Sequence, residues 1–232
     1  MLEALGYGAL AASSLLIGAW IGLGGELDRR AVGLVLGFGA GALISSVSFE
    51  LAEDGVRIGG GGSVGIGLAV GALTYYVCDG LVERRSGGGA TGNALALGAF
   101  LDGIPEQLVL GIGIATGEGV SVGLLAAIFV SNLPEAIGAS TGMRAAGRQR
   151  PTILRLWLAV TIVLTLATVA GFGIADNASG ELLGGVNGFA AGALLVMLVD
   201  SMIPEAARQA GRPAGLVTAL GFAVAAGLSG VS

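Results

Sequence analysis

The sequence contains no histidine and no lysine, and its single cysteine is Cys78. The absence of histidine removes the imidazole that serves most often as a metal ligand or acid–base catalyst, and a lone cysteine excludes an internal disulfide. Charged residues make up only 12% of the 232 residues, whereas a soluble domain carries about 25%. Hydrophobic residues reach 54%, and the mean hydropathy is +0.88. These values indicate an integral membrane protein, and the net charge of −5 argues against a nucleic-acid partner.

Apolar stretches long enough to cross a bilayer occur eight times in the sequence. A helix needs about 20 apolar residues to span the hydrocarbon core, so we expect an all-α membrane protein with eight transmembrane helices in one domain, residues 1–232. The first stretch lacks a basic start and a cleavage site, which favours a membrane helix over a signal peptide. The expected spans are Leu2–Leu23, Ala31–Glu53, Val64–Val82, Asn93–Ala115, Val120–Met143, Ile153–Ala175, Leu182–Ala207 and Ala214–Val231.

The arginines predict the orientation of these spans. All 11 basic residues are arginines, and eight spans leave only Arg57 on one side of the membrane. The ten on the other side are Arg29, Arg30, Arg84, Arg85, Arg144, Arg148, Arg150, Arg155, Arg208 and Arg212. Positive charge marks the cytoplasmic side, so we expect both termini outside the cytoplasm, in a plasma (inner) membrane. A missed or additional span would scatter these arginines, so the asymmetry also supports the count of eight.

Two pairs of segments within the chain resemble each other. Gly37–Ile44 parallels Gly188–Leu195, and Phe100–Glu106 parallels Phe129–Glu135. In the expected topology the members of each pair run in opposite directions, so three spans on either side of a central pair would form inverted halves. Inverted repeats with interrupted helices are a common build of secondary transporters. Chance similarity of glycine- and alanine-rich membrane segments is the alternative, and it weighs more for the first pair than for the second.

Three of the five prolines, Pro105, Pro134 and Pro204, lie in apolar-Pro-Glu triplets. A proline inside a helix removes one amide donor and displaces the carbonyl four residues earlier, which is that of Leu101 or Val130 for the first two prolines. In lipid such a carbonyl needs a partner in the protein or in a water-filled cavity. A cation can be that partner; a kink that serves packing alone is the alternative.

Acidic and polar side chains accompany the first two prolines. Residues four apart are neighbours on a helix, so Asp102 and Glu106 share one face, as do Ser131 and Glu135, with Asn132 one residue away. Intramembrane acids usually mark an ion or substrate pathway, and oxygen ligands suit Mn²⁺, Fe²⁺, Mg²⁺ or Zn²⁺. These five residues therefore form the predicted metal site. The cation would be a transported substrate, and no prosthetic cofactor is expected.

Other interpretations of the acidic residues stay open at this point. Glu106 and Glu135 could be protonated and hydrogen-bonded to a neighbouring helix, and Asp102 could lie near the surface. Asp200 and Glu205 fit a solvated helix end as well as a second binding point, and the same question applies to Glu50 and Glu53, which the sequence does not answer.

These motifs resemble the ZIP family of divalent-metal transporters along nearly the whole chain. The fourth and fifth spans of that family carry His-Asn-x-Pro-Glu and (His/Gln)-(Asn/Asp)-x-Pro-Glu; here they read Asp102-Gly-Ile-Pro-Glu106 and Ser131-Asn-Leu-Pro-Glu135. The seventh span of many bacterial members resembles His-Glu-x-Ile-Pro-Glu. The corresponding segment here reads Asp200-Ser-Met-Ile-Pro-Glu205. The resemblance implies a divergent bacterial or archaeal member without histidines. It also implies eight spans in a 3+2+3 inverted repeat, a homodimer, and an elevator-like movement of spans 4 and 5 against spans 2 and 7.

The departures from the family pattern concern the ligands. Asp102 stands at the usual histidine, Ser131 at the usual histidine or glutamine, and Gly103 at the asparagine of the fourth span; the sixth span contains no acid. The resemblance therefore implies one main site on Asp102, Glu106, Glu135 and Asn132, and a second adjacent site that has lost most of its ligands. Without imidazole, selectivity for Zn²⁺ should fall in favour of harder ions.

The expected function is import of Zn²⁺, Mn²⁺ or Fe²⁺ into the cytoplasm without a nucleotide, because a chain without lysine cannot form a phosphate-binding loop. A non-transporting regulatory homologue and a proton or Na⁺ transporter are the alternatives. We expect no enzymatic activity, since the chain has no histidine, cysteine pair or Ser/His/Asp set. The expected partners are the lipid bilayer, the metal cation and a second copy of the chain.

Overall fold

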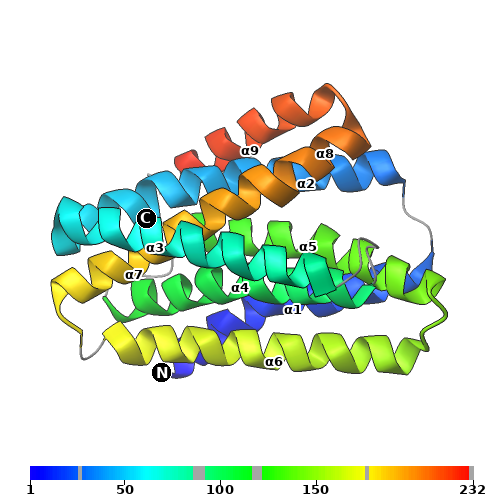
Figure 1. The fold of residues 1–232 in the computed structure, drawn as a ribbon, viewed down its shortest axis with the longest axis horizontal. Coiled ribbons are helices and arrows are strands. Elements are labelled where there is room, and N and C mark those ends of the chain that lie inside the picture. Colours follow the sequence, from blue (N-terminus) through cyan, green and yellow to red (C-terminus); the bar gives the residue numbers. More distant parts are fainter. Residues whose placement is uncertain (26–27, 86–91, 117–121, 176–177, 230–232) are drawn as a thin grey trace.

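A computed structural model describes residues 1–25, 28–85, 92–116, 122–175 and 178–229, with the side chains at 83, 85 and 92–99 left aside. Helices account for nearly all of these residues, and no strand occurs among them, which confirms the all-α expectation (Figure 1). The helices, in chain order, are α1 Leu2–Gly24, α2 Arg29–Ser46, η1 Val47–Glu53, α3 Asp54–Arg85, α4 Gly92–Ala115, α5 Val122–Ala145, α6 Arg150–Ala175, α7 Gly180–Met197, η2 Leu198–Met202, α8 Ile203–Ala210 and α9 Pro213–Ser229.

Five helical stretches within the described residues are long and apolar enough to cross a membrane. They are Leu2–Gly24, Arg29–Val82, Val122–Ala145, Arg150–Ala175 and Gly180–Ala210, and Pro213–Leu228 forms a shorter apolar helix. The count of eight spans stays a prediction, and its ends at Val120 and Val231 fall outside the described residues.

The longest of these stretches contains a sharp break at Gly60. Its backbone has φ 82° and ψ 156°, in a region that only glycine adopts without strain. The chain turns back there (Figure 1), and most of α3 packs along α7 rather than along α2. The expected spans Ala31–Glu53 and Val64–Val82 therefore lie on either side of a real break in the helix.

The helices pack as two groups. The most extensive contacts join α1 to α5 and α6, and α4 to α6; these four helices form the first helical group. Equally extensive contacts join α3 to α7 and α2 to α9, and with α8 these form the second helical group. The two groups meet where α2 packs on α5 and where α4 packs on α7 and α3 (Figure 1).

Glycines allow the helices within each group to approach closely. A Cβ added to Gly18 of α1 would come 2.4 Å from Leu133 O of α5, and one added to Gly22 would come 2.6 Å from Ile137 O. From the first contact to the second, the residue number increases by four in both helices, so α1 and α5 run parallel. Small residues at helix contacts are the usual means of tight packing in a membrane, where lipid is as apolar as the helix surface.

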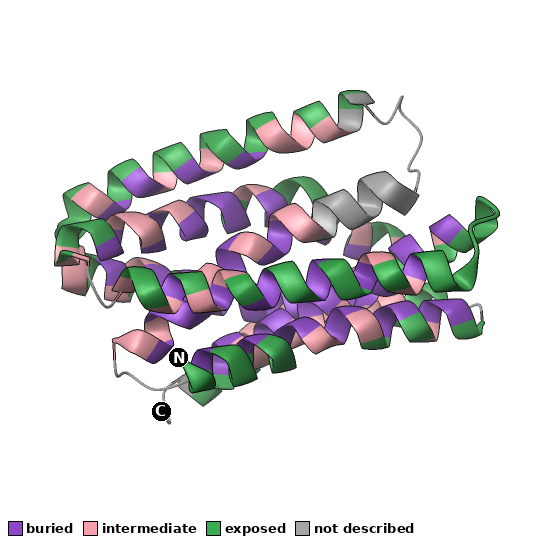
Figure 2. Ribbon diagram, turned by 90° about the horizontal axis from the view of Figure 1, so that it is seen from below, coloured by how far each residue is buried: buried purple, intermediate pink, exposed green. Residues whose placement is uncertain are grey.

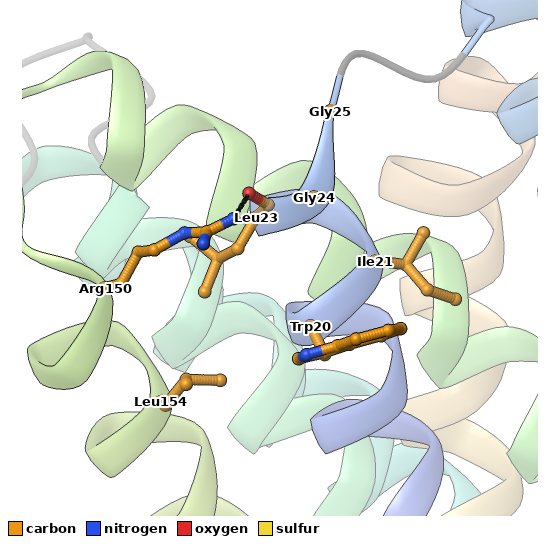
Figure 3. Close-up of a pocket in the computed structure, with 7 residues that line it drawn as sticks. All are labelled: Trp20, Ile21, Leu23, Gly24, Gly25, Arg150 and Leu154. Atoms are coloured by element: carbon orange, nitrogen blue, oxygen red, sulfur yellow. Dashed lines mark hydrogen bonds between the residues drawn. The ribbon is translucent and has the colours of Figure 1, made fainter.

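The C-terminal end of α1 is capped by two arginines from the start of α6 and the end of α5. Arg150 donates to Leu23 O (Figure 3), and Arg144 donates to the same carbonyl. A guanidinium is favourable there because the last carbonyls of a helix are unpaired and carry partial negative charge. The pocket beside this cap contains none of the predicted metal ligands; its lining is Trp20, Ile21, Leu23, Gly24, Gly25, Arg150 and Leu154.

Exposed residues follow the outward faces of the helices, and buried ones follow the faces between them (Figure 2). Many of the exposed side chains are large and apolar, such as Leu216 at 78% and Leu166 at 55% exposure. Surfaces of this kind would be unfavourable in water and suit contact with lipid tails.

Two π-helical segments, η1 and η2, interrupt the second helical group. η1 begins at Val47, ten residues after Gly37, and η2 begins at Leu198, ten residues after Gly188. The two similar segments found in the sequence thus lead into the same irregularity. Short π-helical turns are rare and often occur at functional sites, and the sequence analysis did not predict them.

Candidate metal site

The predicted site lies on α4 and α5, which both run without interruption through their prolines. Pro105 and Pro134 lie inside continuous helices, so the missing amide donor weakens each helix without ending it. The third triplet behaves differently, because Pro204 falls in the first turn of α8, directly after η2. A proline is well tolerated in that position, where the amide would have no helical partner.

The five predicted ligands are removed from the molecular surface to different degrees. Glu106, Ser131 and Asn132 are each 1% exposed and Asp102 is 6% exposed, while Glu135 is partly buried. Asp102 therefore does not lie near the surface. Burial of several carboxyl groups is costly unless each has a proton, a hydrogen-bond donor or a cation.

Few donors serve these carboxyl groups. Ser131 Oγ lies 3.4 Å from Glu106 Oε1 but only 3.0 Å from Ile128 O, and its one proton can serve a single acceptor at a time. Among the described residues, Glu106 Oε2, Glu135 Oε2 and Asn132 Nδ2 are buried without a hydrogen-bond partner. Two helices thus present unpaired oxygen atoms to the same region.

The three acids are close enough to interact electrostatically. Glu135 interacts with both Asp102 and Glu106, and Glu106 interacts with Asp102. Within the part of the chain that the structure describes, however, no three cysteine or acidic side chains form a ready-made cluster around a metal position. Carboxylates repel one another in a medium of low dielectric constant, so a cation would have to draw them together.

Tyr75 of α3 is part of this region, and sequence reasoning missed it. Its hydroxyl donates to Asp102 Oδ1, and the ring is 5% exposed. The neighbouring Tyr76 is 65% exposed. Nothing in an apolar helix with two consecutive tyrosines indicates which one faces the protein interior.

Gly103 is accommodated by a leucine of α6. A Cβ on Gly103 would come 2.5 Å from Leu164 Cδ1, so an apolar side chain occupies the space beside this position. The contact joins the two helices that depart from the family pattern: α4 has Gly103 in place of the asparagine, and α6 contains no acid.

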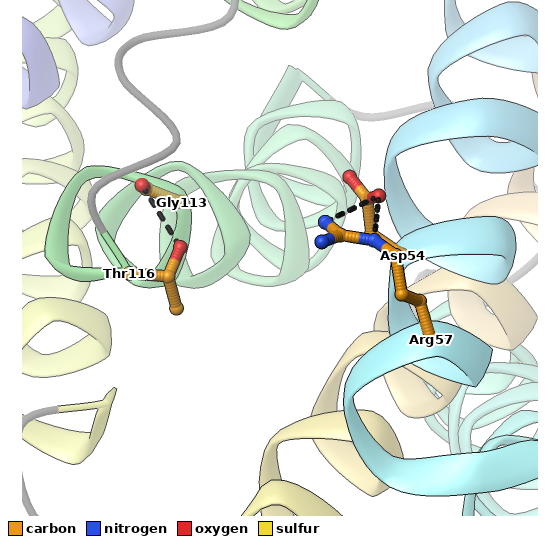
Figure 4. Close-up of polar contacts among 4 residues, drawn as sticks. All are labelled: Asp54, Arg57, Gly113 and Thr116. Carbon is orange, nitrogen blue, oxygen red and sulfur yellow. Dashed lines mark hydrogen bonds and ion pairs between the residues drawn. The ribbon is translucent and has the colours of Figure 1, made fainter.

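Two acids of the second helical group, Asp54 and Glu205, form ion pairs of their own. Asp54 pairs with Arg57 at 2.9 Å (Figure 4), which partly neutralises the one arginine on its expected side of the membrane. Glu205 pairs with Arg208 and accepts from Gln209 Nε2 at 2.5 Å. Its half-exposed ion pair favours a solvated helix end over a second binding point. Glu53 and Asp200 are exposed, and Glu50 is partly buried.

Threonines of α6 bind the first helical group together. Thr161 Oγ1 donates to Ala12 O of α1 at 3.3 Å, and Thr168 Oγ1 donates to Gln107 Oε1 of α4. Gln107 is fully buried and directly follows Glu106, so this bond helps to fix the rotation of α4 about its axis. Gln107 is not among the residues that the sequence predicts for the site.

One comparison with known proteins bears on the identity of the chain. No protein-family model matches it. The chain is 31% identical over 212 residues to an Arabidopsis thaliana protein named "Putative zinc transporter", and the matched region covers 86% of this chain and 34% of that protein. The chain therefore spans about a third of the length of this relative. The similarity is consistent with the resemblance to the ZIP family, and with the long apolar helices it indicates a multi-pass membrane protein.

Proposed function

We propose that the protein transports a divalent metal cation, Zn²⁺, Mn²⁺ or Fe²⁺, through a carboxylate site between α4 and α5. The observation that carries the proposal is the pair of unpartnered buried oxygens, Glu106 Oε2 and Glu135 Oε2, on adjacent helices. A buried carboxylate without a donor is unfavourable, and a cation between two helices would satisfy both at once. The relative named as a zinc transporter supports the same substrate class.

The ligands of the cation would come from both helices. Glu106 and Glu135 would supply the central oxygens, and Asp102 a third carboxylate. Asn132 would contribute the oxygen of its amide and Ser131 its hydroxyl, and both residues are buried beside the carboxylates. An all-oxygen set of this kind favours Mn²⁺ and Fe²⁺ more than a histidine site would.

Matched contacts in the second helical group support an inverted repeat. The similar segments of α2 and α7 each use glycines to approach a partner helix, α9 and α3 respectively. A Cβ on Gly41 would come 1.8 Å from Thr218 O, and one on the equivalent Gly192 would come 2.1 Å from Leu68 O. The reverse contacts match as well: Gly221 against Phe38 O, and Gly71 against Phe189 O.

The same proposal includes the arrangement in the membrane. The chain would cross a plasma (inner) membrane eight times with both termini outside the cytoplasm, as the arginines predict, and would move metal inward as a homodimer. It would need neither a nucleic acid nor a prosthetic cofactor, and it would catalyse no chemical reaction. The parallel packing of α1 with α5 is as expected for two odd-numbered spans.

Transport of protons or Na⁺ is the competing function. The observation that favours it is the lack, among the described side chains, of a ready-made group of three acids, because protons and Na⁺ need fewer ligands. A non-transporting homologue would share the same feature.

Uptake into proteoliposomes distinguishes these functions. We expect the wild-type protein to accumulate Mn²⁺ and Zn²⁺, with Cd²⁺, Fe²⁺ and Mg²⁺ tested as competitors, and we expect Glu106→Gln and Glu135→Gln to abolish uptake. Glu53→Gln is the matched control because Glu53 is exposed. Metal uptake that persists in both site variants would contradict the proposed site. A proton or Na⁺ flux without metal uptake would show that the protein transports that ion instead of a metal.

A further inference from the structure

The hydrogen bond between Tyr75 and Asp102 joins the two helical groups. Tyr75 belongs to α3 in the second group, and Asp102 belongs to α4 in the first. Other buried bonds, such as Trp157 Nε1 to Ser140 Oγ at 2.8 Å and Thr161 Oγ1 to Ala12 O, stay within the first group. The phenol therefore reaches a predicted metal ligand from the other side of the contact between the groups.

The surroundings of this bond are strongly acidic. Tyr75 interacts electrostatically with Asp102, with Asp79 one turn further along α3, and with Glu135 of α5. A phenol can donate one hydrogen bond but carries no positive charge, so it orients Asp102 without neutralising it. Oδ1 accepts from Tyr75, and the remaining lone pairs of the carboxylate stay available to a cation.

We propose that Tyr75 is a positioning residue that holds Asp102 in the orientation for cation binding, and that it thereby makes cation affinity depend on how the two helical groups are arranged. This inference rests on the proposed metal site. Partners that hold a metal ligand from behind commonly change metal affinity by about 10- to 100-fold. Because donor and acceptor belong to different groups, a displacement of one group against the other would break the bond and weaken binding.

The linkage acts in both directions. A cation that binds more tightly in the arrangement with the Tyr75–Asp102 bond also stabilises that arrangement. A bond that served only to join the groups would contribute to stability but leave cation affinity unchanged. The two roles therefore differ in a quantity that can be measured.

The first test compares Tyr75→Phe with Tyr76→Phe. Both substitutions remove one hydroxyl from α3, but Tyr76 is 65% exposed. The readout is the Mn²⁺ or Zn²⁺ concentration that gives half of the maximal thermal stabilisation of the purified protein in detergent. We expect this concentration to rise about 10-fold or more in Tyr75→Phe and to stay within twofold in Tyr76→Phe. Equal half-saturating concentrations for Tyr75→Phe and the wild type would overturn the positioning role. A wild-type protein that is stabilised by neither cation would overturn the metal site itself.

A second measurement needs no variant. Cys78, the single cysteine, is partly buried on α3 three residues after Tyr75, so it lies on the same face of the helix and its alkylation rate reports on how accessible that face is. We expect saturating Mn²⁺ to slow alkylation of the wild-type protein several-fold, since the cation favours the arrangement in which Tyr75 is held. A rate unaffected by bound Mn²⁺ would contradict the coupling even if Tyr75→Phe failed to fold.

Discussion

Gly103 of α4 lies directly against Leu164 of α6, such that a Cβ on the glycine would come 2.5 Å from Leu164 Cδ1. Leu164 is fully buried, and it packs against Gly103, which lies three residues before Glu106 on α4. A metal ion needs polar ligands, and Leu164 presents only a methyl group beside Gly103. The resemblance to the ZIP family implies that a second adjacent site has lost most of its ligands, and this apolar contact would be the physical form of such a loss.

The stoichiometry of binding follows from this contact. We expect one divalent cation per chain at saturation, because Leu164 fills the space beside Gly103, where the resemblance places an asparagine ligand. Equilibrium dialysis with Mn²⁺ against the purified protein measures the number directly, with Glu106→Gln as the control that should reduce it to background. Two cations per chain, both lost in Glu106→Gln, would contradict the apolar filling of the second position.

The contact between α4 and α6 predicts a sharp contrast between two glycines of one helix. A Cβ on Gly111 would come 2.0 Å from Thr168 O, whereas a Cβ on Gly113 would meet nothing within 4 Å. Overpacking against backbone costs about 1–3 kcal/mol or more, so Gly111→Ala should lower the unfolding temperature in detergent by several degrees. Gly113→Ala should be neutral or slightly stabilising, because alanine favours the helix by about 1 kcal/mol. Similar unfolding temperatures for the two variants would show that α4 and α6 do not pack as described.

A buried indole provides a separate test of the first helical group. Trp157 of α6 is fully buried, and its Nε1 donates to Ser140 Oγ of α5 at 2.8 Å. Ser140→Ala leaves that donor unpaired, which costs about 1–3 kcal/mol. The same substitution at Ser48, an exposed residue bonded to Ile44 O of its own helix, should have little effect. Thermal unfolding followed by Trp fluorescence compares the two, and equal stability would place Trp157 in a different environment.

The sequence predicted the all-helical class of the chain, for a clear physical reason. Long apolar runs can only be helices in lipid, and an acid such as Glu106 inside one must face protein. The rotation of each helix about its axis was much less accessible. Helices that are apolar all round show no clear polar face, so the sequence could not distinguish Tyr75 from Tyr76. The π-helical turns at Val47 and Leu198 were likewise unexpected, because they depend on packing between helices rather than on local composition.

The identity of residue 102 should determine which cation is preferred. In the proposed site Asp102, which accepts a hydrogen bond from Tyr75, would supply an oxygen. An imidazole at the same position would supply a nitrogen, a ligand better suited to Zn²⁺ than to Mn²⁺. We therefore expect Asp102→His to raise the preference for Zn²⁺ over Mn²⁺ by on the order of tenfold, measured as the ratio of the two half-saturating concentrations for uptake. Asp102→Asn keeps an oxygen that can accept from the Tyr75 hydroxyl but loses the charge. It should therefore weaken the binding of both cations without changing the ratio of their half-saturating concentrations. A ratio that is the same in Asp102→His and in the wild type would show that residue 102 does not touch the cation.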